Sequence, residues 1–327
     1  MDQSKKNRWI LECLHQLIAN NVIGDKQYDS RYKGFRGEMS FYERCRSNGT
    51  LLYSGGYLLP TTAGAETTQR PIYFTVTSDP PDEVYKKIYS SIGRLECTAL
   101  YFIQYDNTAD PSSWPMVDIM GNGIPLPLPE MKTWLFDVKS SEFKLSVITE
   151  FIDQYLPTSR PNKTRYPIEA RMMQGHISNL IEFHPDDLLS LYVQRLVFDG
   201  MIGFGRVRGI PSDIDGIVCK NNNPEYLLEI KEKDLSKREP RGFGMDLHRI
   251  ESLRKISMLT GLPYYYVVRQ VDNQTDRKFL QWLCIEMGKF VDCVKNYDPI
   301  EGGTGMRSEY SNNPTRVCPQ EKFKIIT

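Results

Sequence analysis

Two short apolar segments joined by a turn, within residues 212–231, constrain the fold of this chain more than any other feature. The first reads Ser212-Asp-Ile-Asp-Gly-Ile-Val218, the second Tyr226-Leu-Leu-Glu-Ile-Lys231, and Asn221-Asn-Asn-Pro224 lies between them. Because asparagine and proline favour turns, the pattern predicts two strands joined as a β-hairpin. Successive side chains of a strand point to opposite faces, so each predicted strand has one apolar face and one charged face.

Periodicity along the rest of the chain predicts an α/β fold. Apolar residues at helical spacing predict helices over 5–21, 82–94, 141–155, 185–198, 246–260 and 274–294. Strand-like runs occupy 50–59, 71–78, 99–104, 134–138, 206–208 and 264–268. The basic and aromatic segment 31–37 contains two glycines, and we expect an irregular loop there or a segment that follows a DNA backbone.

A proline-rich polar stretch at 156–167 has the composition of a linker. We therefore expect a division near residue 160. An α+β domain over 1–160 would recognise the target or regulate the activity, and a second domain over 161–327 would contain the hairpin.

Composition limits the classes of function. The 327 residues include 41 basic and 41 acidic side chains, so any contact with nucleic acid must come from local basic clusters and not from bulk charge. The seven cysteines are dispersed without a CxxC pair, which is typical of reduced thiols in a cytoplasmic protein and argues against zinc. The sequence contains no apolar run long enough for a membrane span and no apolar signal core at its start.

The charged face of the predicted hairpin carries a candidate metal site. Asp213 and Asp215 are two residues apart, as are Glu229 and Lys231, so each pair shares one face of its strand. Ionisable groups on apolar strands cost free energy unless they are paired or bind a metal ion. A hard divalent cation relieves the repulsion between neighbouring carboxylates, lowers the pKa of bound water and polarises a phosphate. A nearby lysine can orient or deprotonate that water. This set is what phosphodiester hydrolysis requires.

The pattern D-x(n)-(D/E)-x-K on a hairpin, within a helix–strand–strand–strand–helix–strand order over about 185–270, resembles the PD-(D/E)XK nuclease superfamily, which includes type II restriction endonucleases. The resemblance implies a restriction-endonuclease-like core, with a mixed central sheet flanked by helices. It also implies that Asp215, Glu229 and Lys231 are catalytic, and that Asp215, Glu229 and the backbone carbonyl of Ile230 bind Mg²⁺, for which Mn²⁺ can substitute.

The aspartate position departs from the pattern of that superfamily. The sequence runs Pro211-Ser-Asp-Ile-Asp215, so the proline-aspartate pair is interrupted. Asp213 is therefore an alternative or accessory metal ligand. Asp215 is preferred because the strand continues directly from it.

The leading hypothesis is a Mg²⁺-dependent DNA endonuclease of the restriction or phage-defence kind, cytoplasmic and acting on double-stranded DNA as a homodimer. Alternatives are a structure-specific nuclease of recombination, repair or transposition, a catalytically inactive nuclease fold that binds DNA, and a solvated charged hairpin without function. Phosphate contacts supply much of the affinity for DNA, and the expected DNA-binding residues form a basic cluster after the motif: Lys233, Lys237, Arg238, Arg241 and Lys255.

Overall fold

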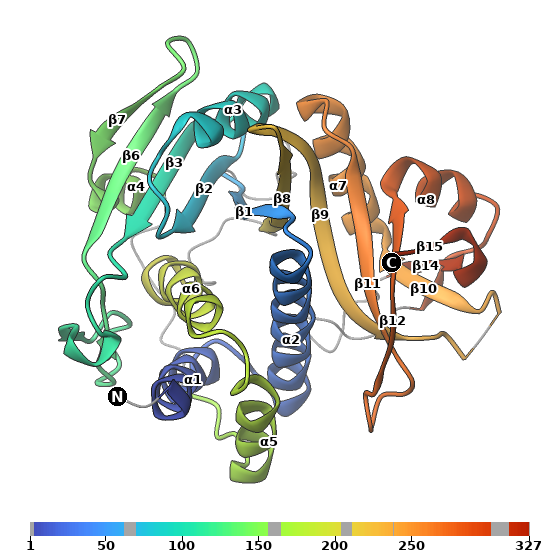
Figure 1. Ribbon diagram of the computed structural model, residues 1–327, viewed down its shortest axis with the longest axis horizontal. Coiled ribbons are helices and arrows are strands. Elements are labelled where there is room, and N and C mark those ends of the chain that lie inside the picture. The colour runs from blue at the N-terminus through green and yellow to red at the C-terminus, as the bar shows by residue number, and fades with distance from the viewer. Residues whose placement is uncertain are drawn as a thin grey trace. The chain divides into compact units, whose positions relative to one another are not determined.

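The computed structural model describes residues 3–61, 70–155, 165–203, 211–237, 239–301 and 314–326. The predicted α/β class is confirmed, with mixed β-sheet flanked by helices (Figure 1). The chain divides into two compact units, unit 1 with residues 1–32 and 54–213 and unit 2 with residues 33–53 and 214–327. Most of the expected linker at 156–167 lies outside the described residues, and the functional division near residue 160 stays a prediction.

In the described residues, unit 1 combines five strands of one sheet and a separate pair of strands with a group of helices. The strand order of the larger group is β1-β2-β3-β6-β7, in which β2 and β3 are parallel and the other neighbouring strands are antiparallel. Strands β4 and β5 form a separate antiparallel pair. Its strands are β1 (Leu51–Leu59), β2 (Ile72–Thr77), β3 (Ala99–Tyr105), β4 (Met116–Val117), β5 (Leu126–Pro127), β6 (Met131–Asp137) and β7 (Glu142–Ser146). Its helices are α1 (Gln3–Ala19), α3 (Glu83–Ile92), α4 (Ile148–Tyr155), α5 (Ala170–Leu180) and α6 (Pro185–Arg195), which a π-helix over Leu196–Ile202 continues.

Three elements of the described chain cross the boundary between the units. Helix α2 (Asp25–Ser47) starts in unit 1 and contributes residues 33–47 to unit 2, and the first three residues of β1 also belong to unit 2. Strand β8 (Ser212–Lys220) has Ser212 and Asp213 in unit 1 and its other residues in unit 2.

Unit 2 contains a second group of sheet strands in the order β15-β12-β11-β9-β8. Strands β9 and β11 are parallel, and the other pairings are antiparallel. The elements are β8 (Ser212–Lys220), β9 (Asn223–Asp234), β10 (Gly242–Asp246), α7 (Leu247–Thr260), β11 (Tyr264–Val271), β12 (Phe279–Glu286), α8 (Met287–Val294), β13 (Ile300–Glu301), β14 (Pro314–Pro319) and β15 (Lys324–Ile325). A smaller sheet has the order β10-β14-β13.

The predicted hairpin is present as β8 and β9. Asn221 and Asn222 have φ values of 51° and 58°, the left-handed backbone that a tight hairpin turn requires and that asparagine tolerates. Strand register places Gly216 beside Leu228 and Val218 beside Tyr226. The apolar face of the hairpin packs in a core cluster that includes Phe41 of α2, together with Cys45, Val218, Leu228, Ile230, Val267 and Trp282. The charged face is therefore the opposite one.

Three segments differ from the prediction. Residues 274–294 are not one helix, because 279–286 pair with β11 as strand β12 and only 287–294 are helical. In the same way, residues 142–146 of the predicted helix 141–155 pair with β6 as β7. Segment 31–37 lies within α2 and is not a loop. The strand expected at 206–208 lies outside the described residues.

Helix α2 owes its close approach to β9 to a glycine. A Cβ atom at Gly37 would lie 3.2 Å from the backbone nitrogen of Glu232, so an alanine there would require its neighbours to shift by a few tenths of an ångström. Arg31, at the other end of the same segment, is buried and pairs with Asp199 Oδ1 at 2.8 Å within unit 1. Gly37 and Arg31 therefore have packing roles. The guanidinium of Arg31 is used in a buried ion pair and does not offer a positive charge to a DNA backbone.

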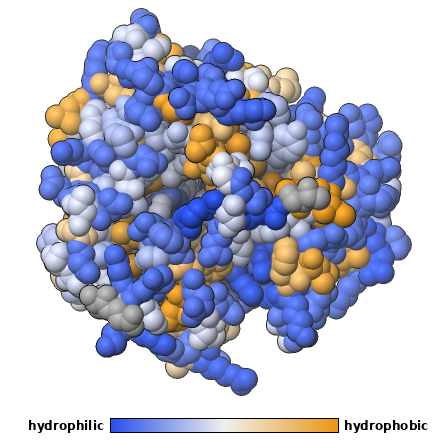
Figure 2. Space-filling model, viewed as in Figure 1, coloured by the Kyte–Doolittle hydropathy of each residue, from blue (hydrophilic) through white to orange (hydrophobic). Residues whose placement is uncertain are grey.

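None of the helices in the described part of the chain combines the length and apolar character that crossing a bilayer demands. Hydrophilic residues predominate on the face shown in Figure 2, and apolar residues form separate patches there.

Candidate functional site

The hairpin brings three carboxylates together. Ligand oxygens of Asp213, Asp215 and Glu229 lie within 4.8 Å of one another, a spacing that would allow them to share one cation. Asp215 and Glu229 are buried, and Asp213 is half-buried. Carboxylate oxygens are the donors that Mg²⁺ and Mn²⁺ prefer. Of all the residues that the structure describes, only these acids form such a cluster. The donor set therefore fits a hard divalent ion.

Asp215 is held in place from two sides. The backbone N–H of Ile230 donates a hydrogen bond to Asp215 Oδ2, with 2.5 Å between nitrogen and oxygen. The hydroxyl of Tyr42, on α2, donates to the backbone carbonyl of Asp215 at 2.7 Å. Ile230 is itself fully buried, so the backbone around the acids is fixed by packing. The proposed role of the Ile230 carbonyl as a metal ligand stays a prediction.

Lys231 lies on the same face of β9 as Glu229. Its Nζ is 3.0 Å from Glu229 Oε1 and 3.5 Å from Asp215 Oδ2. The Lys231 side chain is 35% exposed, whereas that of Glu229 is 1% exposed, so the amine lies at the solvent side of the cluster. The structure thus brings all four ionisable residues that the sequence singled out into one place.

Arg249, near the start of α7, is a site residue that the sequence analysis missed. Its guanidinium NH2 forms a close ion pair with Glu229 Oε2. A signal was available, because Arg249 precedes the buried residues Leu253 and Ile256 by four and seven positions and so lies toward the inner face of α7. Tyr42 was missed as well, and no local pattern around it indicates a contact with β8.

Glu229 pairs with two cations in the described part of the chain, Lys231 and Arg249, and the cluster has three carboxylates. The charge of Lys233, farther along β9, also interacts with Glu229. Burial strengthens the repulsion among the acids, because little water is present to screen it. An incoming dication would therefore be attracted to the cluster.

The residues expected to bind DNA are spread over several elements. Lys233 follows Lys231 on the same face of β9, where burial lowers the pKa of its amine and the neighbouring Lys231 lowers it further. Lys237 is exposed, Lys255 on α7 is half-buried, and Arg238 lies outside the described residues. Their role in binding DNA stays a prediction.

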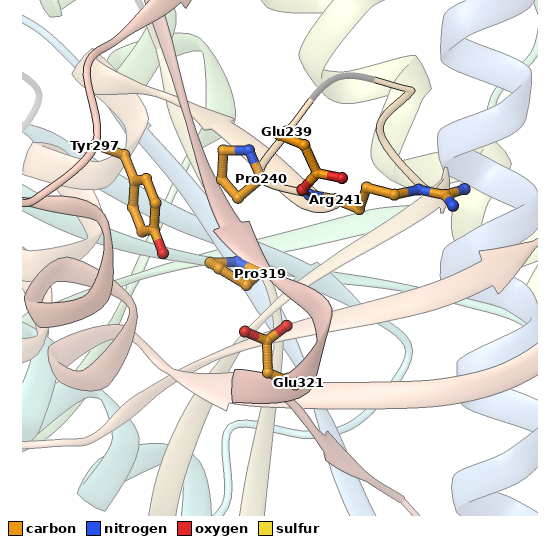
Figure 3. Close-up of a pocket in the computed structure, with 6 residues that line it drawn as sticks. All are labelled: Glu239, Pro240, Arg241, Tyr297, Pro319 and Glu321. Carbon is orange, nitrogen blue, oxygen red and sulfur yellow. Dashed lines mark hydrogen bonds between the residues drawn. The ribbon is translucent and has the colours of Figure 1, made fainter.

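Arg241 lines a separate pocket of about 490 Å³ (Figure 3). Its backbone N–H donates to Glu239 Oε2 at 3.0 Å, and Glu321 lies on another wall of the same pocket. In Figure 3 the Arg241 side chain extends away from Tyr297. Two carboxylates in the lining reduce the attraction of this pocket for a phosphate group.

Comparisons of the chain with protein-family models, with curated proteins and with solved structures give no match. The interpretation of the site therefore rests on its own geometry and chemistry.

Proposed function

We propose that the β8–β9 hairpin, together with the elements of unit 2, forms a Mg²⁺-dependent endodeoxyribonuclease of the PD-(D/E)XK type. One observation carries the proposal. The carboxylate oxygens of Asp213, Asp215 and Glu229 lie within 4.8 Å of one another, and Lys231 Nζ is 3.0 Å from Glu229. Buried acids around a shared position, with a lysine beside them, suit the hydrolysis of a phosphodiester.

The order of elements in unit 2 supports this proposal. Along unit 2 come helix α2, the start of β1, β8, β9, β10, α7 and β11. Apart from β10, which belongs to the smaller sheet, this is the order helix–strand–strand–strand–helix–strand. The helix we expected to open this core, residues 185–198, lies in unit 1 instead. Residues 54–213 then form a long insertion between the first and second core strands. Target recognition by unit 1 follows as part of the proposal.

Each residue of the site has a distinct task in this mechanism. Asp215 and Glu229 would hold the ion, with Asp213 as a further ligand. When bound, the ion supplies Lewis acidity to the scissile phosphate and to a water molecule. Lys231, at the solvent side of the cluster, would orient that water and offset charge that develops on the phosphate. Tyr42 keeps the Asp215 backbone in place through its 2.7 Å hydrogen bond.

The test is cleavage of supercoiled plasmid in Mg²⁺, with EDTA as the metal-free control. Lys231→Ala should abolish cutting while DNA binding in Ca²⁺, measured by mobility shift, stays near that of the wild type. Lys220→Ala is the matched control, because Lys220 is an exposed lysine at the end of β8, away from the acids.

The products would identify the class of nuclease. Discrete fragments favour a restriction enzyme, and cleavage limited to junctions or ends favours a repair nuclease. Full activity of the Lys231→Ala protein would contradict the mechanism. A wild-type protein that binds DNA but cuts none of these substrates in Mg²⁺ or Mn²⁺ would instead be a binding module.

A further inference from the structure

We propose that Arg249 competes with the divalent ion for Glu229 and, once displaced, becomes a ligand for the phosphate of the DNA substrate. This inference rests on the proposed function, because it concerns the same acidic cluster. It assigns Arg249 a substrate-binding role that is coupled to the binding of metal.

The first argument comes from the two oxygens of Glu229. Lys231 occupies Oε1 and Arg249 occupies Oε2, so both oxygens of this buried carboxylate already face a cation. An ion shared with Asp213 and Asp215 must use one of those oxygens. Like charges at such short range repel strongly in a buried site. A carboxylate oxygen can accept more than one partner, but the repulsion between the ion and the two cations is relieved when one of the two side chains moves away.

The second argument identifies Arg249 as the side chain that moves. Lys231 is two residues from Glu229 on the same strand and also lies 3.5 Å from Asp215, so its amine keeps a carboxylate partner without Glu229. Arg249 comes from another element, α7, and reaches Glu229 only through its long side chain. That side chain is 19% exposed, which gives it a path to solvent. Buried Leu253 anchors α7, so the displacement involves the side chain alone.

The third argument concerns the charge that results. Once Arg249 has moved away, the three carboxylates, Lys231 and one dication carry no net charge, so the displaced guanidinium is an additional positive charge beside the cluster. The displaced guanidinium of Arg249 would lie beside the cluster, where it could donate two parallel hydrogen bonds to an anionic ligand. Arginine binds phosphate in a bidentate manner, which lysine cannot reproduce. The phosphodiester of a DNA backbone matches that chemistry.

The experiment measures metal binding separately from DNA binding. Calorimetric titration with Mn²⁺ alone should show about tenfold tighter binding for Arg249→Ala, because a competing cation has been removed. Binding of a duplex oligonucleotide in Ca²⁺ should weaken about tenfold in the same variant. Arg254→Ala changes an exposed arginine of α7 and should leave both affinities unchanged.

A second variant guards against loss of folding. Arg249→Lys keeps the charge, so its Mn²⁺ affinity should stay within about twofold of the wild type, while its DNA affinity falls. If Arg249→Ala binds Mn²⁺ more weakly than the wild type, or equally well, the competition does not exist and the inference is overturned. A wild-type protein that binds no Mn²⁺ would overturn the proposed function itself.

Discussion

The buried carboxylate of Glu232 offers a direct measure of how ion pairs stabilise unit 2. Its side chain is fully buried on β9, on the opposite face of the strand from Lys231. Arg269 NH1 lies 2.8 Å from Oε2, and Arg277 NH2 lies 2.5 Å from Oε1. Arg36 of α2 is farther away, at 4.0 Å. One negative charge thus compensates at least two nearly buried guanidinium groups.

Replacing Glu232 with glutamine keeps the size of the side chain and removes the charge. Breaking a buried ion pair by removing one partner costs about 3–5 kcal/mol, because the remaining charge stays buried without compensation. Arg36 adds little to this figure, since it is the most exposed and most distant of the three arginines. With a urea m-value of about 2 kcal/mol/M, the midpoint of unfolding should fall by about 1.5–2.5 M.

The assay is urea denaturation followed by circular dichroism, with hydrogen exchange of peptides from β9 and β11 to localise the effect. Asp292→Asn is the matched control in the same unit, because it breaks an exposed pair with Lys295 at 3.0 Å. That change should cost less than about 1 kcal/mol. If Glu232→Gln costs no more than the control, the guanidinium groups are compensated by other means and the reasoning about burial is wrong.

Two further predictions concern pH and close packing. Burial lowers the pKa of His15 to about 4, and its Nδ1 lies 2.8 Å from the Tyr28 hydroxyl, so the folded protein keeps this imidazole neutral. Between pH 6.5 and about 4 the unfolded chain binds a proton that the folded one does not, and stability should fall by up to about 3 kcal/mol, less any solvent screening. His15→Gln should remove that part of the pH dependence in denaturation curves at pH 7 and pH 4.5, and an unchanged dependence would rule His15 out. Gly242→Ala should cost more than about 2 kcal/mol in thermal or urea unfolding, because its Cβ would lie 1.9 Å from the Cys318 carbonyl oxygen. Gly288→Ala, whose Cβ would make only ordinary contacts, should change stability by less than about 1 kcal/mol, and equal effects of the two changes would refute the packing argument.

Local patterns in the sequence were sufficient to predict the hairpin and its charged face. Alternation of side chains is a property of any extended strand, so placing Asp213 with Asp215, and Glu229 with Lys231, needs no knowledge of the rest of the fold. The turn at Asn221 follows from the backbone conformations that asparagine tolerates. The end of α7 could also be predicted from local sequence, because glycine is the residue that most readily adopts the left-handed backbone that ends a helix. Gly261 has φ of 73° at that position.

Pairing between distant segments was decided only by the tertiary structure. Residues 279–286 contain apolar residues that suit a helix or a strand, and the hydrogen-bonding edge of β11 selects the strand. Tyr42 and Arg249 are 173 and 20 residues from the site residues they contact, a separation that no periodic pattern encodes. The sequence by itself therefore determined which acidic and basic groups share a strand face. The packing of α2 and α7 determined which other groups reach them, because those contacts depend on where whole elements lie.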